Sequence, residues 1–184
     1  MSHPVIAVLV GSLRKGSINK QLAHALARIA GDRAEFRFVR IDDLPLYNQD
    51  FDGDYPALCT RLKDEVKSAD AILFVTPEYN RSIPGVLKNA IDIASRPWGT
   101  NSFAGKPGAV IGTSAGAMST ALAQQHLRNV CVFIDVHLMA QPEAFVRYSE
   151  GLFAEDGTVT EERTRKYLAG FVDSYLAWVA RFSS

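Results

Sequence analysis

The sequence predicts an α/β protein built on a doubly wound parallel sheet. Apolar, β-branched runs alternate with segments of helical period along the whole chain. Several of these runs are almost continuously apolar, which is typical of strands that are covered on both faces. With 184 residues, 47% hydrophobic and 22% charged, the chain is long enough to bury a full core. We therefore expect a single domain spanning residues 1–184.

Five strands and five helices follow from these patterns. The expected strands are Val5–Val10, Glu35–Ile41, Ala71–Thr76, Gly108–Thr113 and Val132–His137. The expected helices are Asn19–Ala30, Pro56–Ser68, Pro84–Ser95, Ala117–Asn129 and Thr160–Phe182. Proline at a first helical position and acidic residues in a first turn support the starts of the third and fifth helices. This alternation is typical of a flavodoxin-like sheet with strand order 2-1-3-4-5 and helices on both faces.

Two connections are longer than a plain turn requires. Asp42–Tyr55 and Ala140–Gly157 both carry Pro, Asp and Gly. Long loops in a small domain are often lids or interface arms. We expect these two segments to border a site or a subunit contact.

Composition excludes several classes of function. Lys+Arg and Asp+Glu are balanced at 20 each, so nothing favours nucleic acid or an anionic membrane as a partner. No apolar stretch is long enough to span a bilayer, and Met1–Val10 lacks the pattern of a signal peptide. Cys59 and Cys131 fit reduced thiols better than a disulfide, and no Cys/His cluster has the spacing of a metal site. We expect a cytoplasmic protein without a structural metal.

The first polar loop, Gly11–Asn19, follows the first strand and opens the first helix. A strand, a loop rich in Gly and Ser and then a helix place backbone N–H groups at the positive end of the helix, where a phosphate binds. Hydroxyl, amide and guanidinium donors of this loop suit a phosphate monoester: Ser12, Ser17, Asn19 and Arg14. An ordinary turn in which Ser17 or Asn19 only caps the helix is the alternative.

Two common nucleotide motifs are missing from this loop. Gly16 is not followed by the lysine of a P-loop, which argues against hydrolysis of a nucleoside triphosphate. No Gly-x-Gly-x-x-Gly follows a strand, so the dinucleotide fingerprint is also absent.

A second loop, Thr76–Asn80, follows the third strand and supplies an aromatic ring and amide groups. In a parallel sheet it lies beside the first loop at the carboxyl edge, where ligands bind. The two loops together indicate a mononucleotide with a flat heterocycle.

Three motifs in this order resemble the NADPH-dependent FMN reductase family. They are Gly11-Ser12-Leu13-Arg14-Lys15-Gly16-Ser17-x-Asn19, Thr76-Pro77-Glu78-Tyr79-Asn80 and the segment Ile83–Asp92. The bacterial quinone and chromate reductases are the most similar branch. The likeness extends through Ala104–Pro107 and Thr113–Gly116 and weakens in the last third of the chain. It implies a flavodoxin-like fold with FMN at the sheet's carboxyl edge and NADPH or NADH as the reductant.

The resemblance also implies the site residues. The FMN phosphate is held by Ser12, Arg14, Ser17 and Asn19, and the isoalloxazine edge is lined by Pro77, Glu78, Tyr79 and Asn80. Ser114 and Gly116 close over the other side. Hydride transfer is the flavin's own chemistry, so we expect no catalytic side chain. Backbone N–H groups of Thr113–Gly116, at the start of a helix, are expected to stabilise charge on the ring. Glu78 is expected to contribute backbone contacts only.

The expected activity is ping-pong reduction of quinones, flavins, azo compounds or chromate. For Arg81 three surroundings are open: an NADPH phosphate, an anionic acceptor, or solvent alone. The resemblance further implies a homodimer that pairs into a tetramer. Apolar surface on the third and fourth helices supports such a contact. Arg128 and Glu143 belong either to a network between subunits or to a pair within one chain.

Two other classes of function remain as alternatives. Gly112–Gly116 fits the Gly-x-Ser-x-Gly elbow of serine hydrolases, with Ser114 as the nucleophile. Its partners would be Asp135 and His137, which lie two apart on one expected strand and so suit a triad poorly. A non-enzymatic FMN electron carrier is the other alternative. Carriers of that kind are usually acidic, and this chain is neutral.

Overall fold

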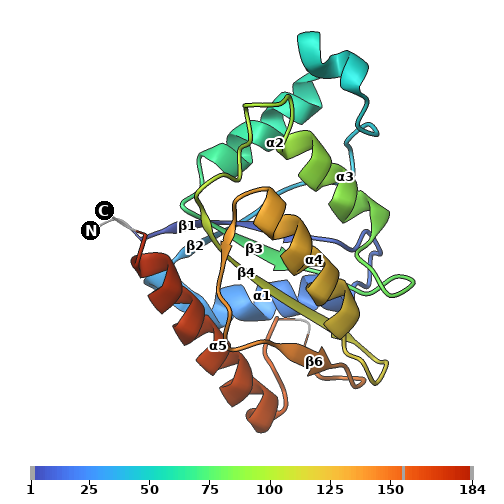
Figure 1. The fold of residues 1–184 in the computed structure, drawn as a ribbon. Helices are drawn as coiled ribbons and strands as arrows, with labels where there is room; N and C mark the ends of the chain where they lie inside the picture. The colour runs from blue at the N-terminus through green and yellow to red at the C-terminus, as the bar shows by residue number, and fades with distance from the viewer. Residues whose placement is uncertain (1–2, 155, 183–184) are drawn as a thin grey trace.

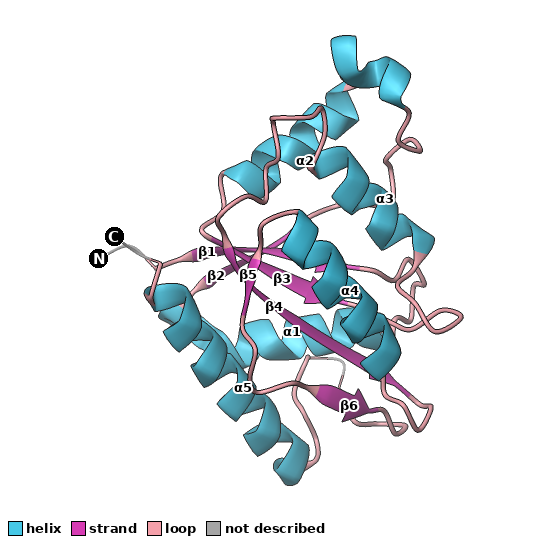
Figure 2. Ribbon diagram, in the orientation of Figure 1, coloured by secondary structure: helices cyan, strands magenta, loops and turns pink. Residues whose placement is uncertain are grey.

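A computed structural model describes residues 3–154 and 156–182 and shows a parallel sheet between two layers of helices (Figures 1 and 2). The strands are β1 (Val5–Val10), β2 (Glu35–Phe38), β3 (Ala71–Val75), β4 (Pro107–Ser114), β5 (His137–Leu138) and β6 (Phe145–Arg147). The order is β2-β1-β3-β4-β5, and β6 pairs with β4 off this path. Every pairing between these strands is parallel. The predicted fold class and strand order are confirmed, and the sixth strand is an addition.

The helices are α1 (Ile18–Ala30), α2 (Ala57–Lys67), α3 (Gly85–Ala94), α4 (Ala121–Phe133) and α5 (Glu162–Ala180). Short 3₁₀ turns form at Gly31–Arg33 and Gln49–Gly53. One core cluster joins the sheet to α1 and α5, and a second joins it to α2, α3 and α4. None of the helices in the described part of the chain is long and apolar enough to cross a membrane.

The central strands are apolar on both sides because both of their faces are covered. Along β1, Ile6 and Val8 pack toward α1 and α5, whereas Ala7 and Leu9 pack toward α2 and α3. This double burial explains the unbroken apolar runs in the sequence. Tyr175 of α5 donates its hydroxyl to the carbonyl oxygen of Ile72 at 2.8 Å and so fixes α5 against the sheet.

The expected fifth strand, Val132–His137, is wrong. The helix α4 continues to Phe133, and β5 is only His137–Leu138. The apolar residues at the end of α4 point to opposite sides of the helix. Cys131 is buried, whereas Val132 and Phe133 are 81% and 67% exposed. Asp135 then reverses the chain with a positive φ of 56°. The second strand is likewise shorter than expected, ending at Phe38 rather than Ile41.

The fourth helix begins later than the sequence indicates, at Ala121 instead of Ala117. Ser119 and Thr120 have φ angles of 44° and 72°, which no α-helix accommodates. The four residues before Ala121 therefore form an irregular turn that belongs to the carboxyl edge of the sheet.

Both long connections are anchored. Ala140–Gly157 contains β6, which pairs with Gly112–Ser114 at the carboxyl end of β4. The Asp42–Tyr55 segment is held by Asn89 of α3, which accepts from the backbone N–H of Tyr47 at 2.8 Å and donates to the carbonyl oxygen of Pro45 at 2.9 Å.

Candidate active site

Three loops meet at the carboxyl edge of the sheet because β3 lies between β1 and β4 and pairs with both. We call them loop 1 (Gly11–Ser17), loop 2 (Thr76–Pro84) and loop 3 (Ala115–Thr120). The backbone N–H of Gly11 donates to Val75 at 2.9 Å, and that of Thr76 donates to Ile111 at 3.0 Å. The predicted juxtaposition of the first two loops is present in the structure.

Loop 1 ends in a capped helix terminus. The Ser17 hydroxyl accepts from the backbone N–H of Lys20 at 3.2 Å, so the capping interpretation of Ser17 is confirmed. No acidic residue lies in the first turn of α1. Since the first N–H groups of a helix have no acceptor within it, those of Ile18 and Asn19 are directed out of the α1 terminus. This terminus has the character of an anion site.

The predicted phosphate donors of loop 1 differ in their surroundings. Ser12 and Ser17 are buried, whereas Arg14 is exposed. The Arg14 guanidinium donates to the carbonyl oxygen of Gly16 at 2.9 Å and so lies over its own loop. The remaining N–H groups of the guanidinium are available to an anion at the loop surface.

Asn19 has a role that the sequence did not predict. Its side-chain amide donates to the carbonyl oxygen of Thr113 and its side-chain oxygen accepts from the Thr113 N–H, both at 3.0 Å. Asn19 is only 2% exposed. The amide expected to face a phosphate instead ties the start of α1 to the end of β4, which makes Asn19 a positioning residue.

Loop 2 folds into a tight hairpin turn. Tyr79 and Ser82 exchange two backbone hydrogen bonds of 2.9 and 3.0 Å, and the residues between them, Asn80 and Arg81, have φ angles of 51° and 67°. Two consecutive positive φ angles are the signature of a type I′ turn. The turn leaves Tyr79 52% exposed, while Pro77 is buried next to Gly11 of loop 1.

Glu78 caps a helix that lies 44 residues further along the chain. Its Oε2 atom accepts from the backbone N–H groups of Leu122 and Ala123 at 3.0 and 3.2 Å. Thr120, at the N-cap position of α4, makes no side-chain capping bond. The carboxylate therefore lies at the positive end of α4 and connects loop 2 to the first turn of that helix. The expectation that Glu78 offers the flavin backbone contacts alone stays a prediction, and the side chain has a separate role as a cap of α4.

Two of the backbone N–H groups of Thr113–Gly116, which were expected to stabilise charge on the ring, already have acceptors within the chain. The Gly116 N–H donates to the Ser114 hydroxyl at 3.0 Å, and the Thr113 N–H donates to Asn19. These two N–H groups are thus satisfied within the chain, and they lie before the start of α4 rather than in its first turn. The positive φ angles of Ser119 and Thr120 displace the helix from the strand end.

The structure contradicts the serine hydrolase alternative. His137 pairs with Pro107 at the opposite end of β4 from Ser114. Seven strand residues at about 3.3 Å each separate the two ends by roughly 23 Å. Gly112 has a packing role, because a Cβ atom there would lie 2.1 Å from the carbonyl oxygen of Thr76. The described residues also contain no group of His, Cys, Asp or Glu able to hold a metal ion.

The chemistry of this edge fits FMN. The open α1 terminus, with Arg14 beside it and no acid in its first turn, suits the phosphate. The exposed Tyr79 ring on a rigid turn offers a surface for a flat heterocycle. Loops 1 and 2 are in contact, since a Cβ atom on Gly11 would lie 3.4 Å from Pro77. The loop that opens α1 and the loop that bears Tyr79 are therefore adjacent, as a mononucleotide requires.

Comparison with known proteins identifies a family. Residues 4–151 match the family model described as NADPH-dependent FMN reductase. The chain is 56% identical over 174 residues to a 2-hydroxy-1,4-benzoquinone reductase of Burkholderia sp, covering 95% of both chains. It is 45% identical over 175 residues to a quinone reductase of Pseudomonas putida, covering 95% of this chain and 94% of that one.

A solved structure is similar over nearly its whole length. It is FerB, a flavoenzyme NAD(P)H:(acceptor) oxidoreductase from Paracoccus denitrificans, with a TM-score of 0.94 and 48% identity over 97% of this chain and 98% of that one. The three-loop edge, the family match and this agreement in fold lead to one assignment. The chain belongs to the NADPH-dependent FMN reductase family.

Proposed function

We propose that the protein is an FMN-dependent NAD(P)H oxidoreductase that reduces quinones. One observation carries the proposal: the α1 terminus, free of acidic residues, and the Tyr79–Ser82 turn follow neighbouring strands at the same carboxyl edge. Relatives named quinone reductases support the acceptor class. The same names favour an enzyme over a non-enzymatic electron carrier.

Bound FMN supplies the hydride chemistry, and the chain supplies position and electrostatics. The first turn of α1, Arg14, Ser12 and Ser17 neutralise and hold the phosphate. Asn19 keeps that turn in register with β4 through its two bonds to Thr113.

The ring contacts are divided between loops 2 and 3. Pro77, Glu78, Tyr79 and Asn80 border one edge of the ring, and Ser114 and Gly116 border the other. Glu78 keeps the two loops at a fixed separation by its bonds to α4. No side chain is required as an acid or base.

We infer ping-pong turnover, because both substrates must face the same exposed side of the ring. Purified protein is first loaded with FMN, and NADPH oxidation is followed at several quinone concentrations. Parallel double-reciprocal lines support the scheme. Intersecting lines together with a detectable ternary complex contradict it.

Titration of the apoprotein should show tighter binding of FMN than of FAD, and equal affinity would contradict the phosphate assignment.

We also propose that the protein is cytoplasmic. We further propose that it forms a homodimer, which pairs into a tetramer. Cavities of about 640 and 540 Å³ run between α3 and α4, and the exposed apolar residues Trp98, Val132 and Phe133 lie near one end. Such a surface favours a second copy of the chain.

Arg128 is a less direct candidate for that contact. Its Nη1 donates to the carbonyl oxygen of Met139 at 3.1 Å, and its Nε lies 3.7 Å from Glu143 of the same chain. Sedimentation velocity separates the two possibilities. Phe133→Asp should dissociate the assembly, whereas an unchanged tetramer in Arg128→Ala would remove Arg128 from the interface. A wild-type monomer at micromolar concentration would contradict the assembly.

A further inference from the structure

A pocket of about 360 Å³ lies beside loop 1, at the edge of the sheet formed by β2. We call it the β2 pocket. It is lined by Val8, Val10, Ser12, Leu13, Lys20, His24, Phe38, Val39, Arg40, Ile41 and Asp42. Its volume and its mixture of a buried apolar floor with a few polar groups are typical of small-molecule sites. None of the ring contacts proposed above belongs to it.

The pocket offers an apolar surface for a flat group. Its floor is formed by buried valines of β1, Val8 and Val10. One wall is an aromatic pair in which the rings of His24 and Phe38 are stacked, with centroids 4.3 Å apart and an interplanar angle of 25°. Phe38 is 39% exposed. A heteroaromatic base can pack against such a wall.

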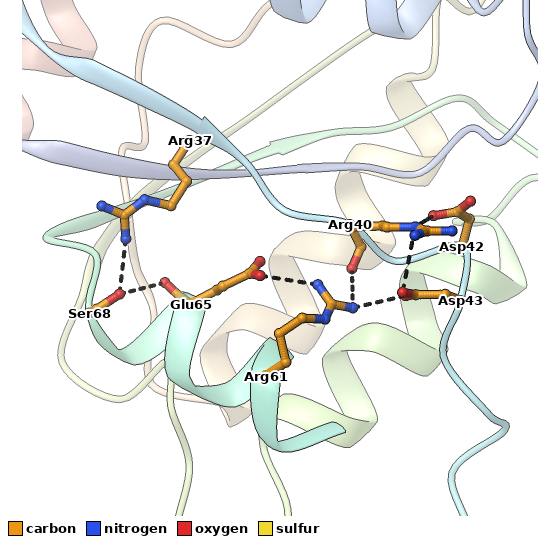
Figure 3. Close-up of polar contacts among 7 residues, drawn as sticks. All are labelled: Arg37, Arg40, Asp42, Asp43, Arg61, Glu65 and Ser68. Carbon is orange, nitrogen blue, oxygen red and sulfur yellow. Dashed lines mark hydrogen bonds and ion pairs between the residues drawn. The ribbon is translucent and has the colours of Figure 1, made fainter. Parts of the chain in front are cut away.

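Arg40 lines the pocket, and Figure 3 shows the polar contacts that orient its guanidinium. Arg40 donates through Nε to Asp42 at 2.8 Å, and the same atom lies 3.5 Å from Asp43. Asp43 is in turn fixed by Arg61 of α2, at 2.8 Å. Within the described chain, the two terminal nitrogens of Arg40 have no hydrogen-bond partner. A guanidinium held by Nε with its terminal N–H groups free is arranged for a bidentate anion.

Lys20 adds a second cation on the α1 side of the pocket. It forms no ion pair within the described residues. The pKa of Asp42 is held below its usual value mainly by the hydrogen bond from Arg40, and the Lys20 charge acts in the same direction. Lys20 and Arg40 both line the pocket, and Asp42 is the one carboxylate among its lining residues, because Asp43 lies outside the lining and is paired with Arg61.

The position of the pocket suggests which molecule it serves. Strands β2 and β4 are separated by three strand spacings, or about 14 Å, so the pocket lies within reach of a dinucleotide whose other end faces the ring site. In doubly wound dinucleotide-binding sheets, an Asp or Arg after the second strand reads the adenosine ribose or its 2′-phosphate. Arg40 and Asp42 follow β2 here.

We propose that the β2 pocket binds the 2′-phosphoadenosine end of NADPH, with Arg40 and Lys20 on the phosphate and the His24–Phe38 wall on the adenine. This inference rests on the proposed function, since it assigns the second end of the same reductant. It makes the pocket the origin of a preference for NADPH over NADH.

Adenosine 2′,5′-bisphosphate is the probe, titrated by calorimetry into the FMN-loaded protein. We expect it to bind more tightly than 5′-AMP. Arg40→Ala and Lys20→Ala should each weaken its binding about 10-fold or more, the usual effect of losing a bond to a charged group. Arg37→Ala is the matched control, because Arg37 lies on β2, three residues before Arg40, but bonds to Glu35 and Ser68 outside the pocket.

The kinetic readout is the ratio of kcat/KM for NADPH to that for NADH. It should fall about 10-fold in Arg40→Ala, with the FMN spectrum and NADH turnover retained. An unchanged ratio, or probe binding that is equal in wild type and Arg40→Ala, overturns the proposal. Failure of the wild-type protein to bind FMN, or to oxidise NADH when loaded with FMN, would instead contradict the proposed function. Weaker FAD binding in Arg40→Ala with unchanged probe binding would assign the pocket to the adenylate of FAD and also overturn the inference.

Discussion

Replacing Glu78 tests the link between loop 2 and α4. Glu78→Ala removes the acceptor of two backbone N–H groups in the first turn of α4. Loss of an N-terminal cap costs about 0.5–2 kcal/mol, and loss of a negative charge at a helix N-terminus costs about 0.3–1 kcal/mol. Since Thr120 supplies no substitute, we expect the free energy of unfolding to fall by about 2 kcal/mol.

Glu78→Gln separates the two contributions. The amide oxygen of glutamine still accepts a hydrogen bond, so only the charge is lost, at about 0.3–1 kcal/mol. In a chain of this length each kcal/mol shifts Tm by about 2–4 °C. We therefore expect Tm to fall by about 4–8 °C in the alanine variant and by less than half of that in the glutamine variant.

Thermal and urea unfolding of the apoprotein measure these effects. Glu150→Ala is the control, because Glu150 is exposed and has no side-chain partner in the described chain. Equal loss of stability in Glu78→Ala and Glu150→Ala would refute the capping role of Glu78. An effect of Glu78→Gln as large as that of Glu78→Ala would show that charge, not hydrogen bonding, dominates.

Two further predictions concern the cofactor and the core. Arg14→Ala should weaken FMN binding about 10–100-fold, and Lys15→Ala should weaken it less, because only Arg14 is fixed over loop 1; equal effects in a fluorescence titration would contradict the phosphate assignment. Burial raises the pKa of the Cys131 thiol to about 12. The unfolded thiol then loses its proton first, so the free energy of unfolding should fall as pH rises above about 9. Urea unfolding between pH 8 and about 10.5 should show a smaller fall in Cys131→Ala, and identical slopes would contradict this cause.

The sequence predicted the sheet order and the meeting of loops 1 and 2 because both depend on local patterns. Apolar runs such as Val5–Val10 and Ala71–Thr76 mark strands, and parallel strands place their following loops at one edge. The same logic failed at Val132–His137. There the apolar residues occupy an exposed helix end, and an apolar run alone does not distinguish a strand from a helix.

The roles of Glu78 and Asn19 could not be predicted from local patterns. Glu78 bonds to residues 44 and 45 positions away, and Asn19 bonds to Thr113, 94 positions away. Such contacts exist only once the sheet has formed. The sequence carries no signal for the cap, because Thr is itself a favoured N-cap residue, and only the structure shows that Thr120 makes no capping bond and that Glu78 supplies it.

The β2 pocket illustrates the same limit. Arg40 and Asp42 look like ordinary surface charges in the sequence, and Lys20 and His24 look like the solvated face of a helix. Only the packing of α1 beside the edge strand brings them around one cavity.

The most direct test of the central claim, that the carboxyl edge binds an FMN that carries hydride from NAD(P)H to a quinone, is an anaerobic spectrum in two steps. FMN-loaded protein, freed of excess flavin, is mixed first with NADPH and then with benzoquinone. We predict that the flavin colour is retained on the protein, bleaches with NADPH and returns fully with the quinone. Protein that retains no flavin, or retained flavin that NADPH does not bleach, would contradict the account.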